Sequence, residues 1–215
     1  MRIIKKYQWL LLSILFTAAL ISIRMVRTDS LHFLSIEWNL FLAAIPLFVS
    51  HFLAKSKTRI SGGLLFGLWL LFFPNAMYII TDLFHLSEGA PIPQWYDLLI
   101  LFTAAVNGAV MGLISLQNAE RYLDKIMPLK YVPFVVFGLF LLCGYGIYLG
   151  RYRYLNSWDI ITRPRALAWG VIMNLRHPLR YEQVWMITGL FGTWLYIVYA
   201  WFKKLKTTSG NNNPN

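Results

Sequence analysis

The sequence contains little charge and almost no cysteine. Only 13% of its 215 residues are charged and 58% are hydrophobic, and its mean hydropathy is +0.53. Such a composition places most of the chain in lipid and leaves no room for a separate soluble domain, such as a nucleotide-binding domain. The one cysteine, Cys143, lies within an apolar run, which excludes an intrachain disulfide and a cysteine metal cluster.

The short motifs of common catalytic sites are also missing. The chain has no H-E-x-x-H pair, no Gly-rich phosphate loop, no G-x-S-x-G elbow and no kinase-like string. Asp82 and His85 could supply two metal ligands, but a single D-x-x-H is not diagnostic of a metal site. We therefore expect neither a metal nor another cofactor.

Six apolar runs are long enough for membrane-spanning helices. The first ends at Arg24 and Arg27 without an A-x-A-like cleavage site, so we interpret it as a signal anchor. The sequence therefore predicts an all-α membrane protein with six transmembrane helices. The runs lie near residues 8–23, 33–54, 60–83, 98–118, 131–150 and 183–202.

The basic residues are distributed unevenly between the connections. With the N-terminus inside, every lysine falls on the cytoplasmic side, while the exterior arginines nearly balance the exterior acids. The positive-inside rule then explains most of the net charge of +11 and predicts that both termini are cytoplasmic. The charge consequently gives no support for nucleic-acid binding.

One long exterior connection, residues 151–182, contains six arginines. Its apolar piece, residues 166–175, is about 15 Å long as a helix, which is half of a bilayer core. We therefore interpret it as an interfacial or re-entrant segment. Residues 1–206 then form a single polytopic domain, and we expect the polar tail, residues 207–215, to be disordered.

Glycines recur four residues apart in three of the runs, a spacing that lets helix backbones approach closely. The alternative is that glycine is simply frequent in membrane helices. The pairs are Gly63 with Gly67, Gly108 with Gly112, and Gly146 with Gly150.

A polar stripe marks the end of the third run. At about 100° per residue, Asn75, Tyr78, Asp82 and His85 fall on one face of a helix, and Pro74 predicts a kink beside them. We expect this face to line an outward-facing polar cleft, with Asp82 in contact with a basic side chain, because an unpaired carboxylate in lipid is costly. The alternative is that these groups only bond neighbouring helices.

A second polar cluster follows the fifth run, in the string GRYRYLNSWD. Arginine rather than lysine suits bidentate recognition of phosphate or carboxylate. We expect this segment to fold over the mouth formed by helices 3 and 4, although its arginines could instead pair with exterior acids or headgroups. Its candidate binding residues are Arg151, Arg153, Asn156, Trp158 and Asp159.

The runs LWLLFFPNAMYIITDLFHL and GRYRYLNSWD together resemble an uncharacterised bacterial membrane family, domain of unknown function 1361. Met77 stands where a PNAPY pattern has proline. The resemblance covers most of the chain and implies a multi-pass protein of the bacterial cytoplasmic membrane. It implies no activity.

Recognition of an anionic lipid headgroup, a lipid-linked intermediate or a small solute at the cleft is the function these patterns favour. Arginines would clamp the anion, while Asp82 and His85, the candidate catalytic residues, would orient it or move a proton. Two alternatives remain: an accessory or assembly protein without catalysis, and a small-solute transporter. Protein partners and oligomeric state are not predicted.

Overall fold

The computed structural model describes residues 2–31, 33–86, 92–153, 155 and 159–211. Every element in these ranges is a helix. Six helical segments within them are long and apolar enough to cross a membrane, which confirms the predicted all-helical membrane fold. They are Tyr7–Thr28, Leu34–Leu53, Arg59–Phe84, Gln94–Ile126, Leu129–Arg153 and Glu182–Leu205.

The chain divides into two compact units, Met1–Tyr122 and Leu123–Asn215. The boundary falls inside one long helix, α4 (Gln94–Ile126). Unit 1 also contains α1 (Arg2–Thr28), α2 (Leu34–Leu53), α3 (Arg59–Tyr78) and the 3₁₀ helix η1 (Ile79–His85). Unit 2 contains η2 (Leu129–Tyr131), α5 (Val132–Arg153), α6 (Asp159–Thr162), α7 (Pro164–Arg176) and α8 (Glu182–Asn211).

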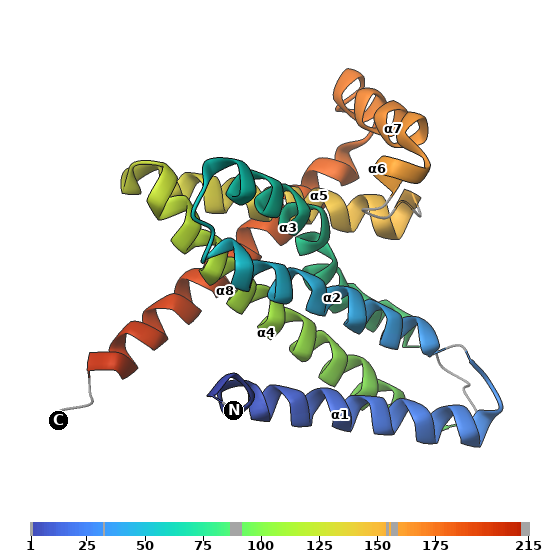
Figure 1. The fold of residues 1–215 in the computed structure, drawn as a ribbon. Coiled ribbons are helices and arrows are strands. Elements are labelled where there is room, and N and C mark those ends of the chain that lie inside the picture. The colour runs from blue at the N-terminus through green and yellow to red at the C-terminus, as the bar shows by residue number, and fades with distance from the viewer. Residues whose placement is uncertain (1, 32, 87–91, 154, 156–158, 212–215) are drawn as a thin grey trace. The chain divides into compact units, whose positions relative to one another are not determined.

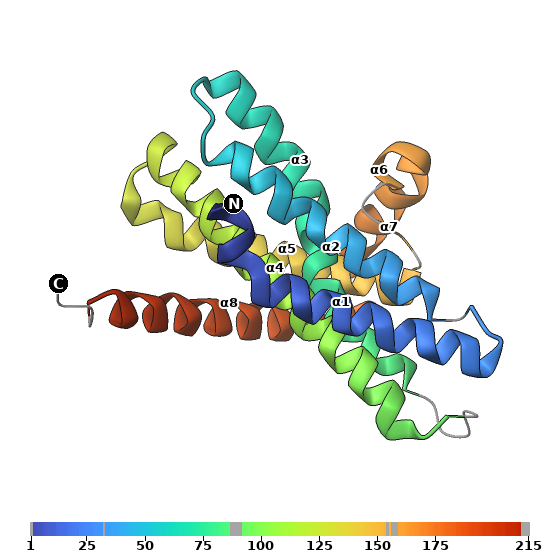
Figure 2. The same cartoon turned by 60° about the horizontal axis from the view of Figure 1, so that its bottom comes forward.

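In unit 1, α2 and α3 form an antiparallel pair joined by a short turn (Figures 1 and 2). Thr58 caps α3, because its hydroxyl accepts a hydrogen bond of 3.2 Å from the backbone N–H of Ser61. The core of this unit is formed by Phe33, Ile36, Ile79 and Ile100, together with smaller residues such as Ala104.

Among the described residues of unit 1, only one of the glycine pairs is packed against another helix. A Cβ atom on Gly108 would meet the side chain of Ile79 and lie 3.0 Å from the carbonyl oxygen of Ala76. One on Gly112 would lie 3.1 Å from the Cβ of Ala76. This confirms the close approach predicted for this pair. Gly63 and Gly67 have no described atom beyond their own helix within 4 Å of such a position.

The helical geometry changes in the middle of the predicted polar stripe. The α-helix ends at Tyr78 and continues as the 3₁₀ helix η1, so the stripe does not lie on one continuous α-helix as the sequence suggested. β-branched residues in the run Ile79, Ile80 and Thr81 fit an α-helix less well. The Thr81 hydroxyl also donates to the Tyr78 carbonyl at 2.7 Å, which satisfies a group at the transition.

In unit 2, α5 and α8 pack as an antiparallel pair through two glycines. A Cβ atom on Gly144 would lie 2.6 Å from the carbonyl oxygen of Thr188, and one on Gly192 would lie 2.9 Å from the Cα of Leu141. Only glycine permits such a close approach of two backbones.

The apolar segment expected at residues 166–175 is α7, a helix of 13 residues (Figure 1). At about 20 Å it is too short to cross a bilayer core. Pro164 begins it at a position that suits proline. At the other end of the chain, α8 continues through Asn211, past residue 207 where the disordered tail was expected to begin, and residues 212–215 lie outside the described part.

Candidate functional site

Polar side chains gather at one end of unit 1, where α1 and η1 end and α2 and α4 begin. Two acidic residues, Asp82 and Asp97, are buried there. An arginine binds Asp97, whereas an asparagine donates to Asp82. The two carboxylates are therefore described separately below.

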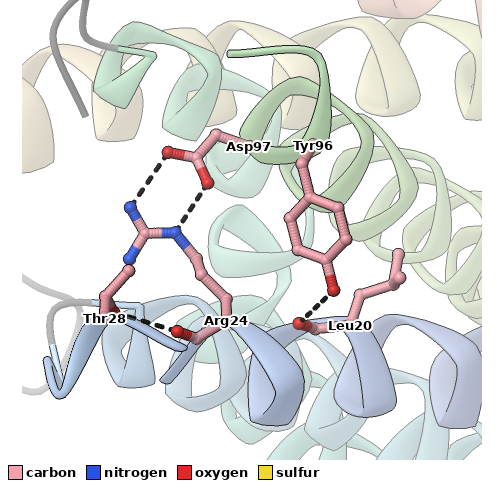
Figure 3. Close-up of polar contacts among 5 residues, drawn as sticks. All are labelled: Leu20, Arg24, Thr28, Tyr96 and Asp97. Atoms are coloured by element: carbon pink, nitrogen blue, oxygen red, sulfur yellow. Dashed lines mark hydrogen bonds and ion pairs between the residues drawn. The ribbon is translucent and has the colours of Figure 1, made fainter. Parts of the chain in front are cut away.

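Asp97 forms a bidentate ion pair with Arg24 of α1. Arg24 donates from Nε to Oδ1 at 2.6 Å and from its terminal nitrogen to Oδ2 at 2.9 Å (Figure 3). The two side chains are only 7% and 3% exposed. The guanidinium carbon also lies 3.6 Å from the centre of the Phe33 ring, a cation–π contact. Both charges are therefore fully compensated, and the pair ties α1 to α4.

Two further hydrogen bonds surround this ion pair. The hydroxyl of Tyr96 donates to the carbonyl oxygen of Leu20 at 3.0 Å, and the hydroxyl of Thr28 donates to the carbonyl oxygen of Arg24 at 2.9 Å (Figure 3). The hydrogen bond of Tyr96 joins α4 to α1 one helical turn away from Arg24. This arrangement was not predicted from the sequence, although an arginine at the end of the first run that is predicted to be exterior, against the positive-inside bias, was a signal for it.

Asp82 is buried in η1 and accepts a hydrogen bond of 2.9 Å from the side-chain amide of Asn39 in α2. It therefore faces protein, as expected for a carboxylate within a span. The expected contact with a basic side chain stays a prediction. Asn75 and Tyr78 are half-buried, and the amide of Asn75 donates to the carbonyl oxygen of Phe72 at 3.3 Å. The side chain of His85 lies outside the described part.

Other polar residues link the helices of unit 1 along their length. Asn107 donates to Thr17 at 3.1 Å, Asn118 donates to Ser50 at 3.0 Å, and Trp69 donates to Ser115 at 3.3 Å. These residues were not predicted from the sequence. The sequence feature that could have predicted them is a polar side chain in the middle of an apolar run, because such a side chain needs a hydrogen-bond partner in lipid.

In unit 2, Asp159 begins α6 and forms a bidentate ion pair with Arg163, four residues further on. Arg163 donates from Nε to Oδ1 and from its terminal nitrogen to Oδ2, both at 2.8 Å, and Thr162 donates to Oδ1 at 2.7 Å. The hydrogen bond to Asp159, and then its negative charge, raise the pKa of the Arg163 guanidinium. Asp159 therefore organises the turn into α7.

The other candidate residues of this cluster lie at the end of α5. Arg151 is half-buried and Arg153 is exposed, whereas Asn156 and Trp158 fall outside the described residues. Asn75, Tyr78, Asp82 and His85 belong to unit 1, while Arg151, Arg153 and Asp159 belong to unit 2. The expected fold of this segment over the mouth of helices 3 and 4, which would join the two sets, stays a prediction.

Helix α7 has one buried face and one exposed face. On the buried face, Asn174 donates to the hydroxyl of Tyr145 in α5 at 3.1 Å. On the opposite face, Trp169, Ile172 and Leu175 are 59%, 42% and 62% exposed. The exposed residues Arg165 and Arg176 lie at the two ends of the helix. These five residues are called the α7 outer face below.

A family model described as "Protein of unknown function (DUF1361)" matches residues 38–198. No curated protein matches the chain. No solved structure matches it either. The matched region contains both the FFPNAMYIITDLFHL run and the GRYRYLNSWD string, on which the resemblance rests. The chain therefore belongs to the DUF1361 family of proteins of unknown function.

Proposed function

We propose that this protein binds an anionic phospholipid headgroup at the membrane surface, and that the α7 outer face is the binding element. The single observation that carries the proposal is the exposure of apolar and cationic side chains on the same face. Trp169, Ile172 and Leu175 lie between Arg165 and Arg176 on a helix that is too short to span the bilayer.

This pattern is the one that an interfacial helix requires. Its apolar side chains enter the boundary between headgroups and acyl chains, and its charged ends remain at the level of the phosphates. Tryptophan favours the same depth. Arginine presents a planar fork that matches the oxygens of a phosphate. On the buried face of α7, the hydrogen bond from Asn174 to Tyr145 attaches the helix to α5.

The face favours a lipid headgroup over a small soluble anion. A soluble anion needs only charged groups, and the three exposed apolar side chains would then lie in water without a partner. Arg163 is not included in the site, because its Nε and one of its terminal nitrogens already donate to the carboxylate of Asp159. Each arginine of the α7 outer face should contribute about 1 kcal/mol of attraction to an anionic surface.

A local fluorescence experiment tests this proposal. Cys143 is replaced by alanine, and a cysteine at the exposed position Ala168 carries an environment-sensitive fluorophore. The protein is reconstituted into vesicles that contain either spin-labelled phosphatidylglycerol or spin-labelled phosphatidylcholine. We expect stronger quenching by phosphatidylglycerol, and an about fivefold loss of that preference for each of Arg165→Gln and Arg176→Gln.

The matched control is the double variant Lys57→Gln with Arg59→Gln, which removes two exposed charges from unit 1. It should leave the preference at position 168 unchanged. Equal quenching by the two lipids in the unaltered protein would overturn the proposal. Loss of the preference on addition of millimolar inorganic phosphate would instead identify a soluble anion as the ligand.

An accessory or assembly role is the second candidate, and the polar contacts of unit 1 favour it. Asn39, Asn107 and Asn118 each donate to a side chain of another helix, so these polar groups act as structural links. Asp82→Asn separates this role from catalysis, because an amide oxygen can still accept the Asn39 hydrogen bond. Normal membrane abundance and a normal cellular phenotype in this variant would support the structural role. Normal abundance with a lost phenotype would support chemistry at Asp82.

A further inference from the structure

A groove lies on the surface of α2, at the beginning of this membrane span. It has a volume of about 500 Å³ and is lined by Leu34, Ser35, Glu37, Trp38 and Phe41. We call it the α2 groove. It belongs to unit 1, shares no residue with the α7 outer face and does not depend on the function proposed above.

The α2 groove contains one charged group. Glu37 is half-buried, and it makes no hydrogen bond or ion pair with any residue of the described chain. Its position in the first turn of α2 lets the helix dipole stabilise the carboxylate. The dipole explains why a charge is tolerated there, but it supplies no partner for the carboxylate oxygens. A carboxylate near the hydrocarbon boundary favours a cation as its partner.

The walls beside Glu37 are aromatic. Trp38 and Phe41 are 54% and 59% exposed. Their rings stack with centroids 5.6 Å apart and an interplanar angle of 29°. Tryptophan is the best partner for a cation over an aromatic face, and aromatic walls are typical of sites that bind ammonium groups. The carboxylate and the rings therefore favour the same kind of ligand.

The rest of the α2 surface suits an acyl chain. Phe41, Phe48 and Phe52 are exposed and follow one face of the helix from the groove toward its other end. Phe48 and Phe52 contact each other with ring centroids 5.1 Å apart. A ligand with an ammonium head and a long hydrocarbon tail would fill the groove with its head and follow this face with its tail.

We infer that the α2 groove binds the primary ammonium group of an aminophospholipid such as phosphatidylethanolamine. A primary ammonium can donate hydrogen bonds to both oxygens of Glu37, which the quaternary ammonium of phosphatidylcholine cannot do. Phosphatidylglycerol has no cation to offer. The groove therefore distinguishes the three lipids by whether the headgroup has an ammonium group and whether that group can donate hydrogen bonds.

Lipid retention measured by native mass spectrometry tests this inference. The purified full-length chain is released from micelles that contain equal amounts of phosphatidylethanolamine, phosphatidylcholine and phosphatidylglycerol, and the bound lipids are identified by mass. We expect phosphatidylethanolamine to be retained in preference to phosphatidylcholine. Glu37→Gln should lower phosphatidylethanolamine retention about tenfold, and Trp38→Leu should lower it about fivefold.

Glu182→Gln is the matched control, because Glu182, although more exposed than Glu37, is also a glutamate in the first turn of a membrane-spanning helix. It should leave retention unchanged. The melting temperature of each variant shows whether the fold is intact. Equal retention of phosphatidylethanolamine by the unaltered protein and Glu37→Gln, an equal loss in Glu182→Gln, or retention of phosphatidylcholine at the same level would overturn the inference. So would a dimeric mass that Glu37→Gln abolishes, since the groove would then hold a second copy.

Discussion

Arg24 and Asp97 form a bidentate ion pair between the end of α1 and the beginning of α4, with donor–acceptor distances of 2.6 and 2.9 Å. The two residues are 73 positions apart in the chain. The pair therefore fixes the first span to a specific depth on the fourth. If only one of the two residues is replaced, the other charge stays buried without a partner. In lipid this costs more free energy than the absence of both charges.

Removing either partner of this pair should destabilise the protein strongly. We expect Arg24→Gln or Asp97→Asn to cost about 3–5 kcal/mol, the usual effect of leaving one buried charge uncompensated. The exchange Arg24→Asp with Asp97→Arg should recover part of the loss. Membrane abundance and the melting temperature in detergent measure both effects. Arg27→Gln, an exposed position one turn away, is the control and should be nearly neutral.

Added side chains should destabilise the protein at one of the two glycine pairs of unit 1 and be tolerated at the other. Gly108→Ala and Gly112→Ala place a Cβ against Ala76 and its neighbours, and overpacking of this kind costs about 1–3 kcal/mol. Gly63→Ala and Gly67→Ala add the same group at the same spacing where nothing described lies within 4 Å. Thermal unfolding should show no loss for the second pair. A loss of equal size in both pairs would contradict the packing of α4 against α3.

Asp159 should matter more than its partner Arg163. The Asp159 side chain is 2% exposed and accepts from both Thr162 and Arg163, whereas the Arg163 side chain is 53% exposed. Asp159→Asn should therefore increase proteolytic cleavage between α6 and α7, while Arg163→Gln should have a smaller effect because solvent screens its charge. Limited proteolysis compares the two variants. A larger effect of Arg163→Gln would show that the arginine has another role.

This ion pair should also be insensitive to pH near neutrality. The hydrogen bond to Asp159, and then its negative charge, raise the pKa of Arg163 above its ordinary value. A raised pKa stabilises the folded state at every pH below the unfolded value, and the stabilisation is lost only as pH rises through the folded value. Proteolytic protection of this turn should consequently stay constant from pH 7 to mildly alkaline conditions.

The orientation of the chain can be tested with an impermeant thiol reagent. In a background where Cys143 is replaced by alanine, a cysteine at Gly89 should react in intact cells, and one at Thr208 should react only after the membrane is opened. With both termini in the cytoplasm, all lysines lie on the cytoplasmic side, as the positive-inside rule favours. The reverse pattern of labelling would overturn the predicted orientation.

The sequence alone determined the all-helical class and the number of membrane-spanning helices, but not the change from α-helix to 3₁₀ helix at Ile79. A helix in lipid satisfies its backbone hydrogen bonds within itself, so a local run of apolar residues is enough to predict each span. The short length of residues 166–175 likewise excluded a seventh span, and α7 is a helix of 13 residues. The polar string that ends α5 and the stripe near Asp82 were also visible, because polar residues stand out in an apolar chain.

The tertiary structure decided which polar groups meet. Arg24 with Asp97, Asn39 with Asp82 and Asn107 with Thr17 join different helices, and their pairing depends on how each helix is rotated and where it crosses its neighbour. The same reason explains the glycines: the spacing of Gly63 and Gly67 matches that of Gly108 and Gly112, but in the part of the chain that the structure describes only the second pair faces another helix. Local sequence fixes the period of a helix, and only packing between helices fixes which side of it lies inward.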